Sequence, residues 1–289
     1  MKSPISFSSM SFFYVNQDAP ENPNDLTQDD INILFKDFSL NLEPGVTSVI
    51  GENGIGKSTL LLLAGARLFP VQGQIEIFGV PTSEFRLALD NSDLEEKRNK
   101  LVSFVYQNME FETPRELGSV LEQVAENGEL DERFAPGTAV TLVKELHTAL
   151  ELKEYLNRPM EGLAKGVMQR AVIAMALLYG SNIILMDEPV FAMEEPRKEQ
   201  VLEYVQAYSS SYQTPVVFTA HQIHLCQTYS DSMLILQKSM SEDEAPYVYG
   251  PTKEIATKEI IEQAYRVPFE TLHQKEFLYR EMLVKKFGN

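Results

Sequence analysis

The sequence of 289 residues contains a single cysteine, Cys226, so an internal disulfide is excluded. One thiol fits a reducing compartment better than secretion, and we expect Cys226 to be a small buried residue.

The first ten residues lack a basic stretch followed by an apolar core, so no signal peptide is predicted. The longest apolar runs, Leu60–Ala64 and Ala171–Tyr179, are shorter than the roughly 18 residues that span a bilayer. Contact with a membrane is therefore expected only through a partner protein.

Basic residues are also scarce in this chain. The 25 Lys and Arg stand against 42 Asp and Glu, which gives a formal net charge of −17. The sequence contains no run of Lys or Arg, no internal repeat and no low-complexity tract. A surface of this sign repels nucleic acid and anionic lipid. We therefore expect no nucleic-acid partner.

Short apolar segments alternate with longer helical patterns along most of the chain. The predicted strands are Ile5–Val15, Ile33–Leu42, Val46–Ile50, Gln74–Phe78, Val102–Tyr106, Ile183–Met186, Val216–Thr219 and Met233–Gln237. The predicted helices are Ser58–Leu68, Ala171–Tyr179, Arg197–Ser209 and Lys258–Tyr265, with a helical block between about 108 and 170. The polar segment Asn16–Asp30 is predicted to form an exposed loop. The alternation predicts an α/β fold whose mainly parallel sheet is wrapped by helices.

A glycine-rich segment with the sequence GENGIGKST lies between the predicted strand Val46–Ile50 and the helix that follows it. This pattern and context are typical of a P-loop, because glycines let backbone N–H groups converge on phosphate oxygens at a helix N-terminus. We expect Lys57 to reach the β- and γ-phosphates, Ser58 to ligate Mg²⁺ and Thr59 to reach the α-phosphate. The residues expected to contact the nucleotide are Gly51, Asn53, Gly54, Gly56, Lys57, Ser58 and Thr59.

A second motif is the apolar strand Ile183–Met186, which ends in the acidic pair Asp187 and Glu188. A buried parallel strand presents its carboxyl end to the ligand crevice of the sheet. We expect Asp187 to hold a hydrated Mg²⁺ there and Glu188 to orient and deprotonate the attacking water. Phosphoryl transfer needs positioning and charge neutralisation more than covalent chemistry, so these few groups suffice.

The order of the surrounding motifs narrows the choice among nucleotide hydrolases. Gln107 follows a predicted strand, the segment Leu163–Arg170 precedes the acidic pair, and His221 follows the strand Val216–Thr219. From about Tyr14 onward, the chain resembles the ATPase subunits of ABC transporters. The resemblance implies a P-loop NTPase core with a mainly parallel sheet, an antiparallel β subdomain and a helical subdomain. It also implies ATP and Mg²⁺ as cofactors, a transmembrane permease as partner and a second ATPase subunit.

The resemblance extends to individual residues outside the two motifs. It implies that Tyr14 stacks on adenine, with Phe13 as the rival for this position. It implies that Gln107 touches the metal and the water and senses the permease. His221 corresponds to the histidine that contacts the γ-phosphate.

The chain departs from the family at the segment 163–167, where LAKGV replaces the usual LSGGQ. In the family this segment, here including Ala164 and Gly166, caps the γ-phosphate bound by the opposing subunit. Ala164 has no hydroxyl for that contact, and Lys165 either blocks close approach or brings an ammonium to the phosphate. Glu194 stands where the family has a dimer-contacting Asp. The chain is then expected to be one half of an asymmetric pair or a slow homodimer.

The expected organisation is an ATPase domain over residues 1–240, with a helical subdomain at about 108–170 that docks the permease. Residues 241–289 are expected to form an extension packed on the core. The tail segment GPTKEIATKEIIEQAYRVP resembles the tails of ATPase subunits that serve importers of iron chelates, haem or cobalamin, although an ordinary amphipathic helix explains it equally well. The resemblance places the chain in the cytoplasm, on the inner face of the cell membrane.

The leading hypothesis is thus ATP hydrolysis coupled to transport, with import as the expected direction. A nucleotide-gated subunit that dimerises on ATP but hardly hydrolyses it is the second hypothesis, favoured by Ala164 and Lys165. A soluble ABC-like ATPase outside transport is the third, and the acidic charge speaks against its nucleic-acid forms.

Overall fold

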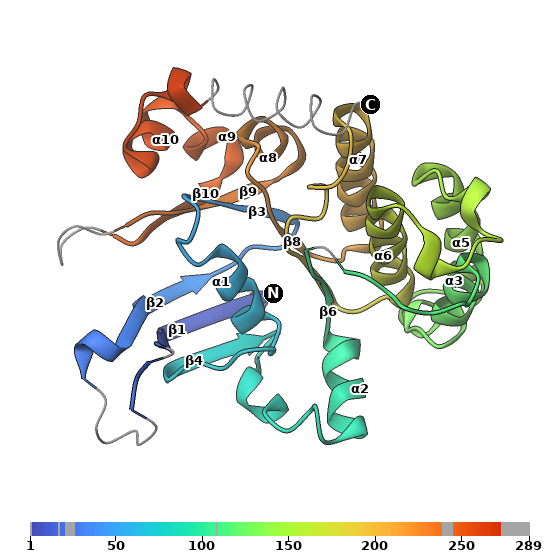
Figure 1. Ribbon diagram of the computed structural model, residues 1–289, viewed down its shortest axis with the longest axis horizontal. Coiled ribbons are helices and arrows are strands. Elements are labelled where there is room, and N and C mark those ends of the chain that lie inside the picture. The colour runs from blue at the N-terminus through green and yellow to red at the C-terminus, as the bar shows by residue number, and fades with distance from the viewer. Residues whose placement is uncertain (1, 17, 21–26, 108, 239–244, 273–289) are drawn as a thin grey trace.

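The computed structural model describes residues 2–16, 18–20, 27–107, 109–238 and 245–272. A six-stranded sheet, a four-stranded sheet and the helices around them make an α/β structure (Figure 1). Most strand pairs of the larger sheet are parallel and all pairs of the smaller sheet are antiparallel. The expected fold class is therefore confirmed.

The parallel part of the larger sheet is buried on both faces. β3 (Val46–Ile50) lies between β8 (Val216–Thr219) and β9 (Ser232–Leu236). β7 (Ile183–Met186) and β6 (Val102–Val105) continue the sheet beyond β8. Every residue of β3, β7, β8 and β9 is buried, as expected for parallel strands that are covered by helices on both sides.

Alternate residues of the strands feed two separate cores. In β7, Ile183 and Leu185 pack with α1 (Lys57–Ala64) and the smaller sheet. Ile184 and Met186 point to the opposite face and pack with the later helices. The helices that contribute to this second core include α6 (Lys165–Tyr179), α7 (Glu195–Tyr212), α8 (Ile223–Tyr229) and α10 (Lys258–Tyr265).

The smaller sheet has the order β2-β1-β4-β5. Its strands are β1 (Ile5–Val15), β2 (Ile31–Asn41), β4 (Gln72–Ile77) and β5 (Val80–Pro81). Inward-facing residues of β1 and β2, among them Phe7, Phe12 and Phe35, belong to the core that includes α1. The smaller sheet thereby packs against α1, the helix that follows the glycine-rich loop, and holds it in place.

Three helices lie in the block between 108 and 170, beside α6 (Figure 1). They are α3 (Leu117–Glu126), α4 (Leu130–Arg133) and α5 (Thr138–Ala149), and short 3-10 turns follow at Lys153–Tyr155 and Met160–Gly162. Fully buried leucines of α3 and α5 pack with α6 in one core. The predicted helical character of this block is confirmed for its described residues.

The C-terminal part completes the larger sheet. β10 (Tyr247–Pro251) pairs with β9 in the antiparallel direction and forms that edge of the sheet. The short helix α9 (Thr252–Ile255) and α10 follow it. Ile261 of α10 is fully buried and shares a core with Ile50 of β3. The predicted helix at Lys258–Tyr265 is confirmed.

Some predicted elements differ in length or were missed. α2 (Ser92–Leu101) and β10 were not predicted. The helix expected over Ser58–Leu68 ends at Ala64, because Gly65 caps it and Ala66 adopts a left-handed backbone with φ of 52°. The helix expected from Ala171 begins earlier, at Lys165.

Two further expectations concern the polar loop and the membrane. Of the expected loop 16–30, residues 17 and 21–26 lie outside the described residues, and Gln28–Asp30 forms a 3-10 turn. Within the described ranges, every helix is too short or too polar to cross a bilayer.

Candidate functional site

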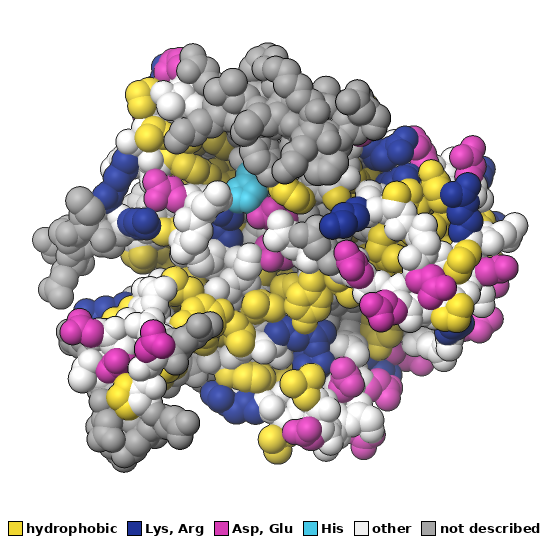
Figure 2. Space-filling view, in the orientation of Figure 1, with side chains coloured by type: hydrophobic (Ala, Val, Ile, Leu, Met, Phe, Trp, Pro, Cys, Tyr) yellow, Lys and Arg dark blue, Asp and Glu magenta, His cyan; other side chains and the backbone are white. Residues whose placement is uncertain are grey.

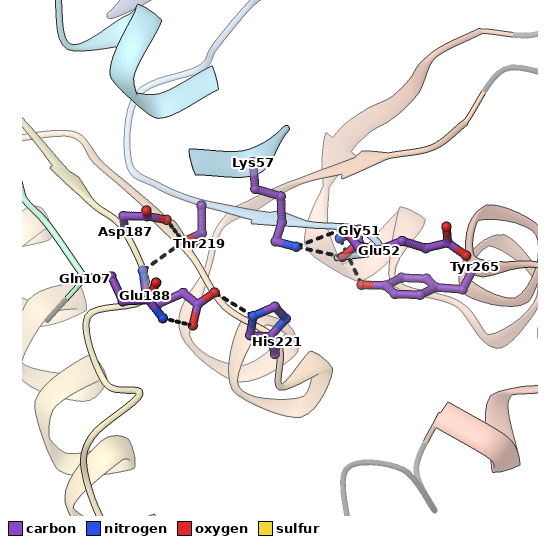
Figure 3. A network of polar contacts seen from close by, with 9 residues as sticks. All are labelled: Gly51, Glu52, Lys57, Gln107, Asp187, Glu188, Thr219, His221 and Tyr265. Carbon is purple, nitrogen blue, oxygen red and sulfur yellow. Dashed lines mark hydrogen bonds and ion pairs between the residues drawn. The ribbon is translucent and has the colours of Figure 1, made fainter. Parts of the chain in front are cut away.

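The candidate site forms where the parallel strands end. The glycine-rich loop follows β3, Gln107 comes just after β6, Asp187 and Glu188 follow β7, and His221 comes just after β8. Carboxyl ends of parallel strands meet at one edge of a sheet, which is where α/β folds bind ligands. Figure 3 shows these side chains converging at that edge.

The glycine-rich loop is shaped by three residues with positive φ: Gly51 at 148°, Gly54 at 77° and Gly56 at 108°. A Cβ atom on Gly51 would lie 2.7 Å from the carbonyl oxygen of Leu236, so that position has no room for a side chain. Gly56 is the N-cap of α1, which begins at Lys57. The loop therefore presents backbone amides and a helix N-terminus, an arrangement that favours an anionic group such as phosphate.

Lys57 is 7% exposed and folds back over the loop. Its Nζ donates hydrogen bonds to the carbonyl oxygens of Gly51, at 2.9 Å, and Glu52, at 3.1 Å. Burial lowers the pKa of Lys57, and the carboxylates of Glu188 and Asp187 partly offset this effect. Within the described residues the hydrogen bonds of the ammonium go to carbonyl oxygens, so an incoming phosphate can attract it away from them.

Asp187 and Glu188 are held by one hydroxyl group. The Thr219 hydroxyl donates to Oδ1 of Asp187 at 2.7 Å and accepts from the backbone N–H of Glu188 at 2.8 Å. Asp187 is 8% exposed, and Glu188 adopts a left-handed backbone with φ of 47°. Thr219, the last residue of β8, thus sets the direction of both acidic residues.

The Glu188 side chain receives a polar partner on each oxygen. Nε2 of Gln107 donates to Oε2 at 2.8 Å, and Nε2 of His221 lies 2.5 Å from Oε1 (Figure 3). The Glu188 side chain is 11% exposed, whereas that of His221 is 41% exposed. The sequence placed these three residues in one site from separate motifs, and the structure brings them together.

Tyr14 lies beside the same loop. Its hydroxyl is 3.2 Å from the Thr59 hydroxyl, and its ring packs edge-on against Phe12 at 5.0 Å. Tyr14 is 41% exposed, which leaves an aromatic residue open to solvent next to the loop.

The segment with Ala164 and Gly166 lies apart from the loop. Ala164 is the N-cap of α6 and supplies no side-chain cap, and a Cβ on Gly166 would lie 2.9 Å from the carbonyl oxygen of Ala192. Lys165 is 75% exposed, and its Nζ lies 3.9 Å from Oε1 of Glu110. Ala164 and Gly166, which were expected to belong to the site, therefore do not meet the glycine-rich loop of the same chain.

The residues at the strand ends also suit a hard cation. Among the described residues, no group of three or more His, Cys, Asp or Glu could hold a metal ion. Ser58 at the start of α1 offers a hydroxyl oxygen and Asp187 a carboxylate oxygen, and the side chain of Gln107 is hydrogen-bonded to Glu188, the residue after Asp187. Mg²⁺ is commonly held by one or two protein oxygens, with phosphate oxygens and water completing the shell. This donor set fits Mg²⁺ bound together with a phosphate ligand.

The space-filling view shows a hollow at the centre of one face, where a histidine, acidic and basic side chains come together (Figure 2).

The sequence analysis missed two residues of this region. The sequence did contain a signal for Thr219, because this polar residue ends an apolar strand two positions before His221. Tyr265, whose hydroxyl accepts from the backbone N–H of Gly51, had none, because only tertiary structure brings α10 to the loop.

The chain is similar to known proteins in sequence and in fold. The family model for ABC transporters matches residues 35–191, more than half of the chain. The molybdenum import ATP-binding protein ModC of Saccharophagus degradans is 28% identical over 66% of this chain and 50% of its own length. The petrobactin import ATP-binding protein FpuD of Bacillus anthracis is 25% identical over 81% of this chain and 82% of its own. The matched segment thus spans about half the length of the molybdenum relative.

A solved structure has the same fold. It is a dimeric ATP-binding cassette in a post-hydrolysis state, bound to ADP and Pi, with a TM-score of 0.61 and 22% identity. The likeness covers 80% of this chain and 93% of that one. The residues matched by the family model include the loop, Gln107 and the acidic pair, which lie together in the structure. On this evidence the chain belongs to the ABC transporter family.

Proposed function

We propose that the chain binds and hydrolyses ATP as the subunit that powers an ABC transporter, and that the transporter is an importer. The observation that carries this proposal is the convergence of the loop, the buried Lys57 and the paired Asp187 and Glu188 at one sheet edge. The direction of transport is supported by the names of the relatives, which are import proteins for molybdenum and petrobactin.

In this proposal the loop binds the phosphates of ATP. The amides of the loop that follow Gly51 and the N-terminus of α1 face the phosphate oxygens, and Lys57 moves from the two carbonyls to the β- and γ-phosphates. The N–H of Gly51, which was expected to contact the nucleotide, donates to the Tyr265 hydroxyl instead. Tyr14 offers its exposed ring to the adenine. Ser58, Asp187 and Gln107 hold Mg²⁺, which neutralises phosphate charge when bound.

Hydrolysis depends on the residues around Glu188. Its carboxylate takes the proton of the attacking water, for which it has to exchange at least one of its two present partners. His221 is more exposed than Glu188 and is free to turn toward the γ-phosphate. Gln107 then keeps the carboxylate in place from the other side.

The proposed partners are a transmembrane permease and a second ATPase subunit, on the inner face of the cell membrane. The helices of the block 108–170 form a lobe beside α6 that we assign to the permease. The exposed start of α6, with Ala164, Lys165 and Gly166, faces the nucleotide of the second subunit. Residues 1–240 act as the ATPase domain and residues 241–289 as its C-terminal extension.

A second candidate, a nucleotide-gated subunit with little hydrolysis, is favoured by the start of α6. Ala164 supplies no hydroxyl, and the exposed Lys165 stands where the family has a glycine. A missing hydrogen bond to a charged phosphate weakens the cap by roughly 1.5–3 kcal/mol.

The test uses the purified chain and its membrane partner. The chain should bind MgATP, release phosphate, and turn over faster when a multi-span permease captured from detergent-solubilised membranes is reconstituted with it. Binding and dimerisation without phosphate release would favour the second candidate. Capture of soluble partners alone, without a permease, would contradict the transport function.

A further inference from the structure

The C-terminal helix α10 contacts the glycine-rich loop directly. The hydroxyl of Tyr265, the last residue of α10, accepts a hydrogen bond from the backbone N–H of Gly51 at 2.9 Å (Figure 3). Gly51 is the first residue of the loop and is buried. More than 200 residues of sequence separate the two groups, so only the folded structure brings them together.

The same glycine is also held from its other side. Its carbonyl oxygen accepts from Nζ of Lys57 at 2.9 Å. Its φ of 148° and its closeness to Leu236 leave no room for a side chain that could fix it. The orientation of Gly51 therefore depends on hydrogen bonds to its backbone, and its N–H is directed at Tyr265 rather than at a phosphate.

Tyr265 is carried on a well-anchored helix. The Thr257 hydroxyl caps the start of α10 by accepting from the N–H of Ile260 at 3.3 Å. Ile261 is fully buried and Ala264 is 5% exposed, so one face of the helix belongs to the core. The Phe269 N–H donates to the Glu262 carboxylate at 2.7 Å just beyond the helix. The Tyr265 hydroxyl thus acts from a fixed position.

A second, weaker link runs parallel to the first. The Arg266 guanidinium donates to the carbonyl oxygen of Lys238 at 2.6 Å, and Nζ of Lys238 lies 3.6 Å from the Glu52 carboxylate. Lys238 is 65% and Glu52 41% exposed, so this ion pair contributes little by itself. The Tyr265 bond is the contact that can fix the loop.

We propose that Tyr265 is a positioning residue for the nucleotide site. It holds Gly51 so that the loop has its binding conformation before a phosphate arrives. The inference rests on the proposed function, because it concerns the loop that binds the nucleotide. Without the hydroxyl the loop populates other conformations, and the apparent Kd rises in inverse proportion to the fraction of loop that remains binding-competent. Bound nucleotide restores that conformation, so turnover is nearly unaffected.

The experiment compares Tyr265→Phe with Tyr249→Phe. The Tyr249 hydroxyl accepts from the backbone N–H of Glu43 at 2.8 Å, which is the same kind of bond at the opposite end of β3. Tyr265→Phe should weaken MgATP and MgADP binding alike, by about fivefold, equivalent to about 1 kcal/mol. KM should rise by the same factor while kcat stays within about twofold. Tyr249→Phe should leave both affinities unchanged.

A second measurement needs no nucleotide. Hydrogen exchange of the Gly51 amide should be faster in Tyr265→Phe than in the parent chain, and unchanged in Tyr249→Phe. Parental affinities together with parental exchange in Tyr265→Phe would overturn the inference. A lower melting temperature and kcat with unchanged Kd would also overturn it, since they indicate a merely structural role. If the parent chain itself fails to bind MgATP, the proposed function fails, and the exchange rate of Gly51 still decides on Tyr265.

Discussion

The glycine-rich loop with its acidic neighbours and the start of α6 differ in how firmly the chain holds them. At the sheet edge, Thr219 orients two acidic residues, Gln107 and His221 hold Glu188, and Lys57 is almost fully buried. At the start of α6, Lys165 is 75% exposed and has one ion pair at 3.9 Å. A group that acts within its own chain is preorganised by that chain. In the proposed function the start of α6 acts on a second subunit, and its site would be completed only when that subunit binds.

The largest effect is expected from Lys57→Ala. It removes a buried ammonium whose hydrogen bonds to phosphate are each worth roughly 1.5–3 kcal/mol, so tight MgATP binding and hydrolysis should both be lost. Nucleotide titration and phosphate release measure this. Lys100→Ala in α2, which removes a lysine paired with Glu96 and Glu129 away from the site, is the control. Parental affinity and turnover in Lys57→Ala would refute the role of the loop.

Glu188→Gln separates binding from chemistry. The amide cannot accept the water proton, so hydrolysis should fall by about 10²–10⁴, the usual contribution of a general base. MgATP should still bind and should trap a dimer, which size-exclusion chromatography with and without ATP detects. A variant that hydrolyses ATP at the parental rate would exclude Glu188 as the base.

Thr219→Val tests how the sheet edge is organised. The valine has a similar shape but leaves the Glu188 N–H and Asp187 Oδ1 without their shared partner. We expect kcat to fall by about tenfold, corresponding to about 1.4 kcal/mol, and Thr219→Ser should restore most of it. Melting temperatures of the two variants show whether folding is affected. A kcat in Thr219→Val equal to that of the parent chain and of Thr219→Ser would show that the hydroxyl does not orient the acidic pair.

The smallest effect is expected at the start of α6. Ala164→Ser combined with Lys165→Gly restores a hydroxyl and a close backbone approach, so the ATPase rate should rise by up to about tenfold in a homodimer. In an asymmetric pair the rise is smaller, because only the partner's nucleotide is affected. Lys165→Ala alone is the control, since it leaves the hydroxyl missing. A lower rate in the double variant would mean that Lys165 is itself a phosphate ligand.

The sequence predicts the buried elements well and the exposed ones poorly. The bounds of β3, β7 and β8 agree with prediction, because a strand buried on both faces is a continuous apolar run between turns. α2 was missed because Arg98 is its only buried residue, so its sequence carries no apolar periodicity. The early start of α6 at Lys165 was missed because Ala164 gives no capping signal.

The candidate site shows the same division. Residues next to strand ends were placed together correctly, because the parallel topology sends all those ends to one edge. No comparable rule predicts the contact of Tyr265 with Gly51 from the sequence, because this contact depends on where α10 packs.

The position of β3 in the sheet affects how the protein is made. β3 pairs with β8 and β9, so Val46 is aligned with Val216, and Thr47 with Ser232. During synthesis from the N-terminus, the loop that follows β3 leaves the ribosome long before either neighbouring strand exists. Pairings so distant along the chain form late in folding. The nascent chain therefore completes the pairing of β3 only after Leu236 has left the ribosome, and until then the apolar β3 has neither of its two neighbouring strands to pair with.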